Sequence, residues 1–280
     1  MHSVAPPPKD PLTEPGPWNA VAAGYDSVYF GQLPELTDAA IELLAPERDD
    51  RVLDVATGPG TLAVRLAPRV KRVVAVDFAD AMLARLRGHI MQQHLSNVEA
   101  RVMNGEQLEF TDGTFDAAVS LFGVFLFDDR ARGLAEMFRV VVPGGKALFS
   151  SWAPPEQNTM LGAGMAALRS ALPELPRPQG PLPTQQPEVC AAELEATGFE
   201  RVTTRLFKKA VSFASVAEYW SDFERAAAPL VVLKKKLGDA AFADAMTRAQ
   251  AVLNDSHGSG AFSLDCAAIF TFGERPLSAA

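Results

Sequence analysis

The chain has little of what several classes of protein require. It holds only two cysteines, Cys190 and Cys266, which argues against a disulfide framework or a structural zinc site. No apolar run reaches the roughly 18 residues needed to span a bilayer. The N-terminal residues MHSVAPPPKD lack the charged and then apolar pattern of a secretory signal. We therefore expect a cytoplasmic protein without a membrane segment or a bound metal.

Positive charge is also scarce. The 26 Lys and Arg residues are outnumbered by 34 Asp and Glu, which gives a net charge of −8. Because a nucleic-acid-binding face needs basic side chains to neutralise phosphates, this balance disfavours a nucleic-acid substrate. The one basic cluster, at 234–236, is most simply the solvated face of a helix. With 48% hydrophobic residues the chain can bury a full core. We expect a small-molecule substrate and a monomer or homodimer.

A strand, a glycine loop and a helix follow one another from residue 51 to residue 67. Val52, Leu53 and Val55 suit a strand that is buried on both faces of a parallel sheet. Gly58 and Gly60 allow a tight turn and a close approach to a ligand, unless they are simple turn glycines. The helix expected after them presents free N–H groups at its start. The segment predicts a ligand cradle at the carboxyl end of a strand.

A second apolar run, RVVAVD, ends at Asp77. An acid at the tip of the second strand, about 20 residues after the glycine loop, is placed to accept hydrogen bonds from ribose hydroxyls. Asp77 can also simply cap the helix that follows. With the glycine loop upstream, we favour a ligand that contains a ribose.

Two kinds of ribose ligand compete for this site. The run GPGTLA at 58–63 fits the G-x-G-x-x-A pattern of NAD-binding proteins. However, the loop lacks a third glycine, and Asp54 lies inside the first strand, where a dinucleotide site has apolar residues. A carboxylate there can reach a cationic amino group, although it can also be a satisfied core residue. Residues 139–149, RVVVPGGKALF, end a helix, turn and enter another strand.

Together these segments resemble the class I S-adenosylmethionine-dependent methyltransferases that act on small molecules, including the quinone-biosynthesis type. The motifs are DVATGPG at 54–60, VDFADAML at 76–83, MNGEQLEF at 103–110 and TFDAAVS at 114–120. The resemblance implies an α/β fold with a doubly wound, mostly parallel seven-stranded sheet, N-terminal helices and a late helical insertion that acts as a lid. It implies S-adenosylmethionine as cofactor and S-adenosylhomocysteine as product. The alternatives are an NAD-dependent oxidoreductase and a non-catalytic S-adenosylmethionine-binding protein.

The resemblance also implies which residues bind the cofactor. Asn104 departs from the family, where most members carry an aspartate that accepts a hydrogen bond from the adenine amino group. The amide oxygen of asparagine can accept the same bond without charge. Phe78 and Met82 can face adenine or belong to the core. The predicted set is Asp54, Ala56, Gly58, Gly60, Asp77, Phe78, Met82, Asn104, Gly105, Glu106, Ser120 and Tyr25.

The acceptor pocket is less sharply defined, and no catalytic residue is assigned. The apolar run SLFGVFLF at 120–127 lacks the motif of adenine- and glutamine-directed methyltransferases and suits a hydrophobic acceptor. Aromatics near the N-terminus can form a lid or can instead fix a helix to the sheet. A histidine in a loop is usually only solvated. The pocket candidates are Trp18, Tyr29, Phe122, Trp152, Tyr219 and His257.

We divide the chain into a disordered tail over 1–17, which holds six prolines, and one methyltransferase domain over 18–280. Within the domain we expect an N-terminal helical cap (18–50), a cofactor-binding core (51–152), a substrate and lid region with the sixth strand (153–260) and a last strand (261–273). The family places this last strand antiparallel, near the edge of the sheet.

Overall fold

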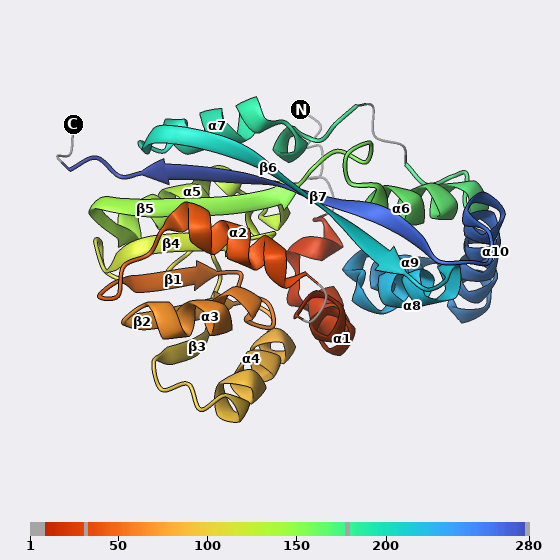
Figure 1. The fold of residues 1–280 in the computed structure, drawn as a ribbon, viewed down its shortest axis with the longest axis horizontal. Coiled ribbons are helices and arrows are strands. Elements are labelled where there is room, and N and C mark those ends of the chain that lie inside the picture. The colour runs from red at the N-terminus through yellow and green to blue at the C-terminus, as the bar shows by residue number, and fades with distance from the viewer. Residues whose placement is uncertain (1–8, 31–32, 177–179, 278–280) are drawn as a thin grey trace, which may run out of the picture.

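The computed structural model describes residues 9–30, 33–176 and 180–277, in which helices cover both faces of a central sheet (Figure 1). The sheet has seven strands in the order β3-β2-β1-β4-β5-β7-β6. Every pairing among the first five is parallel, whereas β7 runs antiparallel to both β5 and β6. The doubly wound, mostly parallel seven-stranded sheet is therefore confirmed, as is the antiparallel last strand near the edge.

The short inner strands are the most deeply buried. Strands β1 and β2 consist mostly of Val, Leu and Ala whose side chains are hidden on both faces, as expected inside a parallel sheet. The edge strand β6 alternates in exposure and carries charged residues, which discourage pairing with another chain. The strands are β1 (Arg51–Val55), β2 (Arg72–Asp77), β3 (Val98–Val102), β4 (Phe115–Leu121), β5 (Val141–Trp152), β6 (Glu200–Phe213) and β7 (Phe262–Glu274).

Local sequence explains where many helices begin. Proline is the first residue of α1, α2 and α7, a position where its missing N–H costs no hydrogen bond. The side chains of Asp129, Asn158 and Ser215 accept hydrogen bonds from the first turns of α5, α6 and α8. The α-helices are α1 (Pro15–Tyr25), α2 (Pro34–Leu44), α3 (Thr61–Leu66), α4 (Asp80–Gln92), α5 (Arg130–Val140), α6 (Thr159–Ala171), α7 (Pro187–Ala196), α8 (Val216–Ala226), α9 (Ala228–Leu237) and α10 (Asp239–His257).

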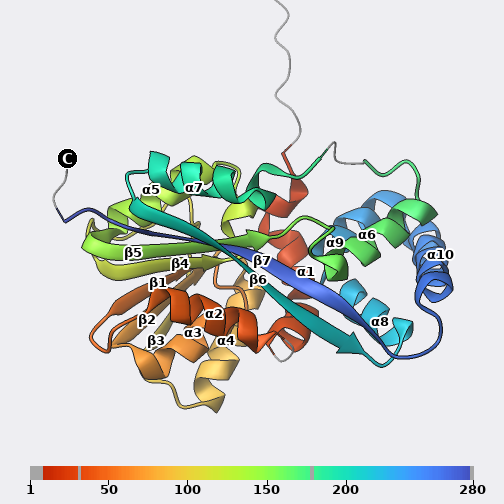
Figure 2. The same cartoon turned by 45° about the horizontal axis from the view of Figure 1, so that its top comes forward.

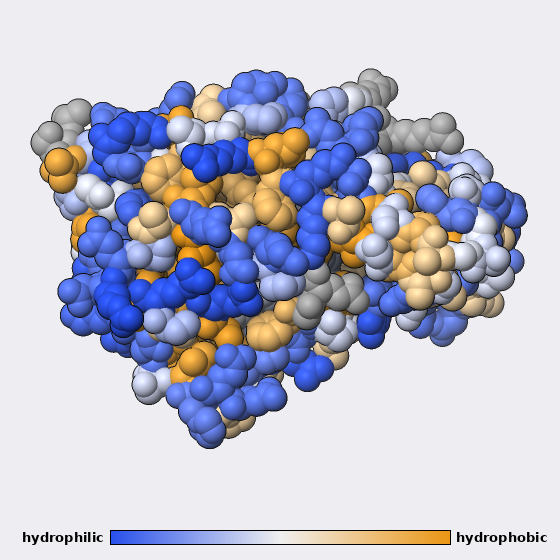
Figure 3. Space-filling view, in the orientation of Figure 1, coloured by the Kyte–Doolittle hydropathy of each residue, from blue (hydrophilic) through white to orange (hydrophobic). Residues whose placement is uncertain are grey.

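The sheet has a hydrophobic core on each face. Helices α2, α3 and α4 pack on one face, against side chains such as Val52 and Val73. Helices α5 and α7 pack on the other face, against Leu53, Val74 and Phe149. Figure 2 shows the two helical layers with the sheet between them. On the surface seen in Figure 3, hydrophobic residues lie in several groups separated by hydrophilic ones.

Two boundaries differ from the prediction. Within the tail predicted over 1–17, residues 1–8 lie outside the described part, but Pro11–Thr13 forms a 3₁₀ turn and α1 begins at Pro15. The high proline content misled the prediction, because proline is well tolerated in the first turn of a helix. Strand β5 also starts at Val141, before the predicted turn. The turn appears instead as a shift in the pairing register with β4, and Gly144 within the strand adopts a φ of +82°.

The late insertion lies at one end of the sheet, where α8, α9 and α10 pack with α6 and α1 (Figure 1). Helices α1 and α8 are very close, since a Cβ atom on Gly24 would collide with the backbone carbonyl of Arg225. The insertion therefore packs directly against α1. In the described part of the chain, no helix combines the length and the apolar character that crossing a bilayer requires.

The core on the α5–α7 face can be tested by truncating Phe149, which is 1% exposed. We expect Phe149→Ala to lower the free energy of unfolding by about 3–5 kcal/mol, because the substitution removes buried apolar surface and leaves a cavity. Met91→Ala is the control, since Met91 on α4 is 72% exposed, and it should change stability by no more than about 0.5 kcal/mol. Urea denaturation measures both, and equal effects would contradict this packing.

Candidate active site

A cavity opens at the carboxyl ends of β1, β2 and β4. The strand order reverses here, because β1 is followed on one side by β2 and on the other by β4. In open α/β sheets, ligands bind in the crevice that such a reversal creates. The N-terminal segment closes the cavity with Tyr25 at the end of α1 and Tyr29 in the following π-helical turn, Asp26–Phe30.

Asp54, near the end of β1, is buried with its side chain lining the cavity. Its Oδ2 accepts a hydrogen bond from the hydroxyl of Thr57 at 2.6 Å. Burial raises the pKa of this carboxyl to about 7; the Thr57 hydrogen bond opposes the rise and the neighbouring Asp77 adds to it. Within the described residues no lysine or arginine forms an ion pair with Asp54, so the site favours a ligand that brings positive charge.

Asp77, the last residue of β2, is 5% exposed and organises two pieces of backbone. Its Oδ2 accepts from the N–H of Gly58 and its Oδ1 from the N–H of Ala79, both at 2.8 Å. Burial raises the pKa of Asp77 to about 6, against the effect of these hydrogen bonds. Asp77 therefore shapes the glycine loop and the start of α4, while its carboxylate still lines the cavity.

The backbone turns sharply where β1 and β4 end. Ala56 and Gly58 adopt φ values of +54° and +57°, and Phe122 adopts +60°. Such values are costly for a residue with a side chain and cluster at functional sites. A Cβ atom on Gly123 would collide with the Cβ atom of Ala56. The residues that follow β1 and β4 therefore approach too closely for a side chain at position 123. This close approach forms the floor of the cavity.

Asn104, Gly105 and Glu106 follow β3 and line another wall. Asn104 Oδ1 accepts a hydrogen bond from the N–H of Glu106 at 2.9 Å, so this amide oxygen already holds its own loop. It keeps a second lone pair for a ligand. A Cβ atom on Gly105 would collide with Phe127, which explains the glycine.

Most residues predicted to bind the cofactor meet in this cavity. Gly60 and Ser120 do not line it. Gly60 packs against Leu86 of α4, and a side chain there would collide. Ser120 is fully buried, and its hydroxyl has no hydrogen-bond partner among the described residues. The predicted residues that line the cavity are Tyr25, Asp54, Ala56, Gly58, Asp77, Phe78, Met82, Asn104, Gly105 and Glu106.

Five aromatic residues form a chain of ring contacts, which we call the aromatic wall: Trp18, Tyr25, Tyr29, Trp152 and Phe122. The centroid distances along it are 6.2, 4.4, 6.2 and 3.8 Å, and the last pair is stacked. All but Trp152 line the cavity, and Trp152 stacks on Phe122. The N-terminal aromatics line the cavity and also pack on neighbouring elements, so the two predicted roles, covering the cavity and fixing a helix, are compatible.

Besides Trp152, two other predicted pocket residues, Tyr219 and His257, do not line the cavity. Tyr219 is 2% exposed, and its hydroxyl donates to the carbonyl of Met160 at 2.6 Å. His257 ends α10 and stacks on Phe262 with a centroid distance of 4.7 Å. Among the described residues, no cavity-lining residue belongs to α8, α9 or α10, so the role of the late insertion as a cover for the acceptor stays a prediction. Its helices pack on α6 and α1, and α1 with the π-helical turn provides the cover.

Sequence reasoning also missed residues that do line the cavity. Lys9 lies at its mouth, and its Nζ is 3.0 Å from both Asp128 Oδ2 and Glu14 Oε1. The proline-rich surroundings of Lys9 carry no periodic signal. On α2, the spacing of Leu33, Leu36 and Thr37 is typical of one buried helix face, but nothing in it distinguishes a cavity wall from core.

Comparison with known proteins identifies the fold and its cofactor. Residues 52–145 match the methyltransferase domain family. A demethylmenaquinone methyltransferase from Deinococcus radiodurans is 34% identical over 177 residues, which cover 58% of this chain and 72% of that protein. The chain belongs to the class I S-adenosylmethionine-dependent methyltransferases. The expected family and its cofactor are confirmed, which favours S-adenosylmethionine over NAD as the ribose-containing ligand.

Other relatives of this methyltransferase match over a smaller share. The ubiquinone/menaquinone biosynthesis C-methyltransferase of Geobacter sulfurreducens is 34% identical over 123 residues, 42% of this chain and 48% of that protein. A solved putative methyltransferase from Bacillus halodurans superposes with a TM-score of 0.57 at 21% identity, covering 86% of this chain and 98% of that one. That structure supports the fold alone. The chain thus spans about three quarters of the first relative and about half of the second.

The cavity of the methyltransferase fits this cofactor. S-adenosylmethionine carries an amino group and a sulfonium, both cationic, and Asp54 is a buried carboxylate without a cationic partner among the described residues. Its ribose has two hydroxyls, which suit a carboxylate such as that of Asp77. Phe78 and Met82 add apolar surface for adenine.

The raised pKa of Asp54 predicts how stability depends on pH. The ligand-free protein binds more protons folded than unfolded between about pH 4, the unfolded value, and about pH 7, the folded one. Stability should therefore fall as pH rises through this window, by at most about 1.4 kcal/mol per pH unit from this carboxyl. Asp54→Asn removes that contribution.

Urea denaturation at about pH 5 and about pH 7.5 checks this expectation. The stability of Asp54→Asn relative to the wild type should increase toward the higher pH. Asp80→Asn is the control, because Asp80 lies on α4 with a side chain 70% exposed. A difference between Asp54→Asn and the wild type that stays constant with pH would contradict the buried, proton-binding carboxyl.

Proposed function

We propose that this protein transfers a methyl group from S-adenosylmethionine to a small, planar, apolar acceptor that carries an ionised ring hydroxyl. The bound cofactor would supply the electrophilic methyl carbon. The observation that carries the proposal is the composition of the cavity away from Asp54 and Asp77. Lys9, Glu106 and Asp128 add charged groups to that lining, but apolar side chains such as Leu62 and Leu121 accompany the aromatic wall.

The aromatic wall itself offers no general base. The polar side chains that it presents to the cavity include the phenols of Tyr25 and Tyr29. Burial raises the pKa of the Tyr29 phenol well above its usual value, and it raises that of Tyr25 as well. Both phenols therefore stay protonated near neutral pH and can donate, but not abstract, a proton. An acceptor that is already ionised, such as a hydroquinone monoanion, needs no base.

The protein's contribution would be positioning and exclusion of water. Asp54 and Asp77 would hold the amino and ribose groups of the donor, and Phe122 and Tyr29 would hold the acceptor ring in line with the methyl group. Aromatic faces suit a flat ring. Holding two reactants in line supplies much of the rate in a substitution of this kind. The printed name of the Deinococcus relative, a demethylmenaquinone methyltransferase, agrees with such an acceptor.

Transfer of a labelled methyl group tests the proposal. We expect label from S-adenosylmethionine to enter a naphthohydroquinone that lacks a ring methyl group, kept reduced, and not to enter cyclohexylamine. Label in the amine alone would overturn the acceptor class. No transfer to either, with no binding of S-adenosylmethionine, would overturn the methyltransferase activity itself.

The aromatic wall can be tested in the same assay. Phe122→Ala should lower kcat/KM for the hydroquinone by about tenfold or more, the equivalent of about 1.4 kcal/mol, and should leave the Kd for S-adenosylhomocysteine nearly unchanged. Phe207→Ala is the matched control, because Phe207 is a half-buried aromatic on β6 that touches Phe270 and does not line the cavity. Equal activity of both variants would contradict the role of Phe122.

A further inference from the structure

The loop between β3 and β4 contributes lining residues to the cavity. It contains no helix or strand. It begins after Val102 and ends before Phe115, and it carries Asn104, Gly105 and Glu106 into the cavity. The backbone groups of such a segment must find partners outside a helix or a sheet ladder. The position of this loop therefore depends on the side chains that bind it.

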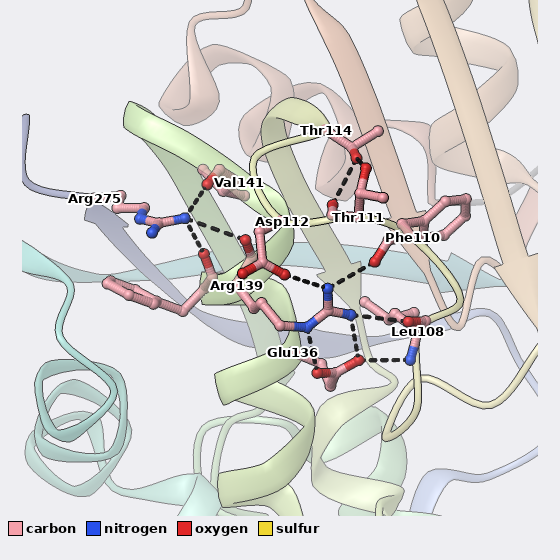
Figure 4. Close-up of polar contacts among 10 residues, drawn as sticks. Leu108, Phe110, Thr111, Asp112, Thr114, Glu136, Arg139, Val141 and Arg275 are labelled. Atoms are coloured by element: carbon pink, nitrogen blue, oxygen red, sulfur yellow. Dashed lines mark hydrogen bonds and ion pairs between the residues drawn. The ribbon is translucent and has the colours of Figure 1, made fainter. Parts of the chain in front are cut away.

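Arg139, near the end of α5, supplies those partners from outside the cavity (Figure 4). Its Nη1 donates to the carbonyl of Phe110 at 2.6 Å and to Asp112 Oδ1 at 2.8 Å. Its Nη2 donates to the carbonyl of Leu108 at 2.9 Å and to Glu136 Oε2 at 2.8 Å. Its Nε donates to Glu136 Oε1 at 2.8 Å. A guanidinium has five N–H donors, and all are used here.

Glu136 completes the attachment. Its Oε2 also accepts from the N–H of Leu108 at 2.7 Å, so the Arg139–Glu136 pair satisfies both backbone groups of Leu108. The hydrogen bonds from Arg139 lower the pKa of Glu136 and keep it ionised. The carbonyl of Arg139 in turn accepts from the N–H of Gly113 at 3.0 Å. The outer half of the loop is therefore fixed to one helix end.

The inner half of the loop is held from the other side. Glu106 Oε1 accepts from the N–H of Asp128 at 2.7 Å, and Asn104 closes a turn onto Glu106. Leu108, the point that Arg139 and Glu136 grip, lies two residues from Glu106 and is buried. A displacement of Leu108 would be transmitted directly to the residues that line the cavity.

We propose that Arg139 is a positioning residue for adenine recognition, which acts by fixing the loop that presents Asn104 and Glu106 to the cofactor. This inference rests on the proposed function. A lysine cannot replace Arg139, because one ammonium with three donors cannot span two carbonyls and two carboxylates in a fixed plane.

Calorimetric titration of S-adenosylhomocysteine into Arg139→Lys tests this role. We expect the Kd to rise by about tenfold or more relative to the wild type. Arg130→Lys is the matched control: Arg130 also lies on α5, its side chain is also 30% exposed, and it is bidentate to Glu193 on α7. This control should keep the wild-type Kd.

A second titration separates positioning from general destabilisation. The inosine analogue of S-adenosylhomocysteine lacks the adenine amino group, and the wild type should bind it less tightly than the adenosine form. In Arg139→Lys that preference should shrink, since the loop no longer holds Asn104 in register. A merely less stable protein would bind both analogues with the same relative preference.

The outcomes are distinct. A wild type that binds neither analogue would overturn the proposed function and this inference with it. A wild type that binds S-adenosylhomocysteine, together with an Arg139→Lys variant of equal affinity and equal preference, would overturn the inference alone. A loss of affinity in Arg130→Lys as large as in Arg139→Lys would also overturn it, because the effect would then belong to α5 as a whole.

Discussion

Two carboxylates buried next to each other at the carboxyl ends of β1 and β2 are the constraint on which the rest of the site depends. Parallel pairing puts Asp54 opposite Ala75 and brings Asp77 two residues further to the same edge of the sheet. Burial raises the pKa of both groups, and the charge of Asp77 also raises that of Asp54. Keeping these acids out of water costs free energy, which a cationic ligand with ribose hydroxyls would recover on binding.

The surrounding elements position or cover these two carboxylates. Asp77 ties the glycine loop to the start of α4 through Gly58 and Ala79, and α1 with the π-helical turn covers the cavity with aromatic rings. The late helical insertion contributes no described residue to the cavity lining; its helices α8 and α9 pack against α1. Arg139 is equally remote, yet it holds the loop that carries Asn104. The residues that line the cavity are thus held in place by contacts that lie outside it.

How far the sequence predicts this arrangement depends on whether a signal is local. The glycine loop, Asp54 and Asp77 are adjacent to strand ends, so hydrophobic patterning predicts their place, and the alternation of strands and helices predicts a mostly parallel sheet. Tyr219 and His257 do not line the cavity; their positions depend on how the late helices pack, which no periodic pattern encodes. Lys9 was missed within a proline-rich segment. Arg139 was read only as a helix end, since its partners lie about 30 residues away in sequence and only the tertiary structure joins them.

The most direct test of the central claim is a calorimetric comparison of S-adenosylhomocysteine with an analogue that lacks both ribose hydroxyls. The wild type should bind the complete molecule about tenfold or more tightly, as expected for charge-assisted hydrogen bonds to Asp77. Asp77→Ala should bind both ligands weakly and without preference, whereas Asp80→Ala, changed at an exposed position on α4, should behave as the wild type. If Asp77→Ala still prefers the hydroxylated ligand as strongly as the wild type does, Asp77 only anchors the glycine loop and the account of the site is wrong.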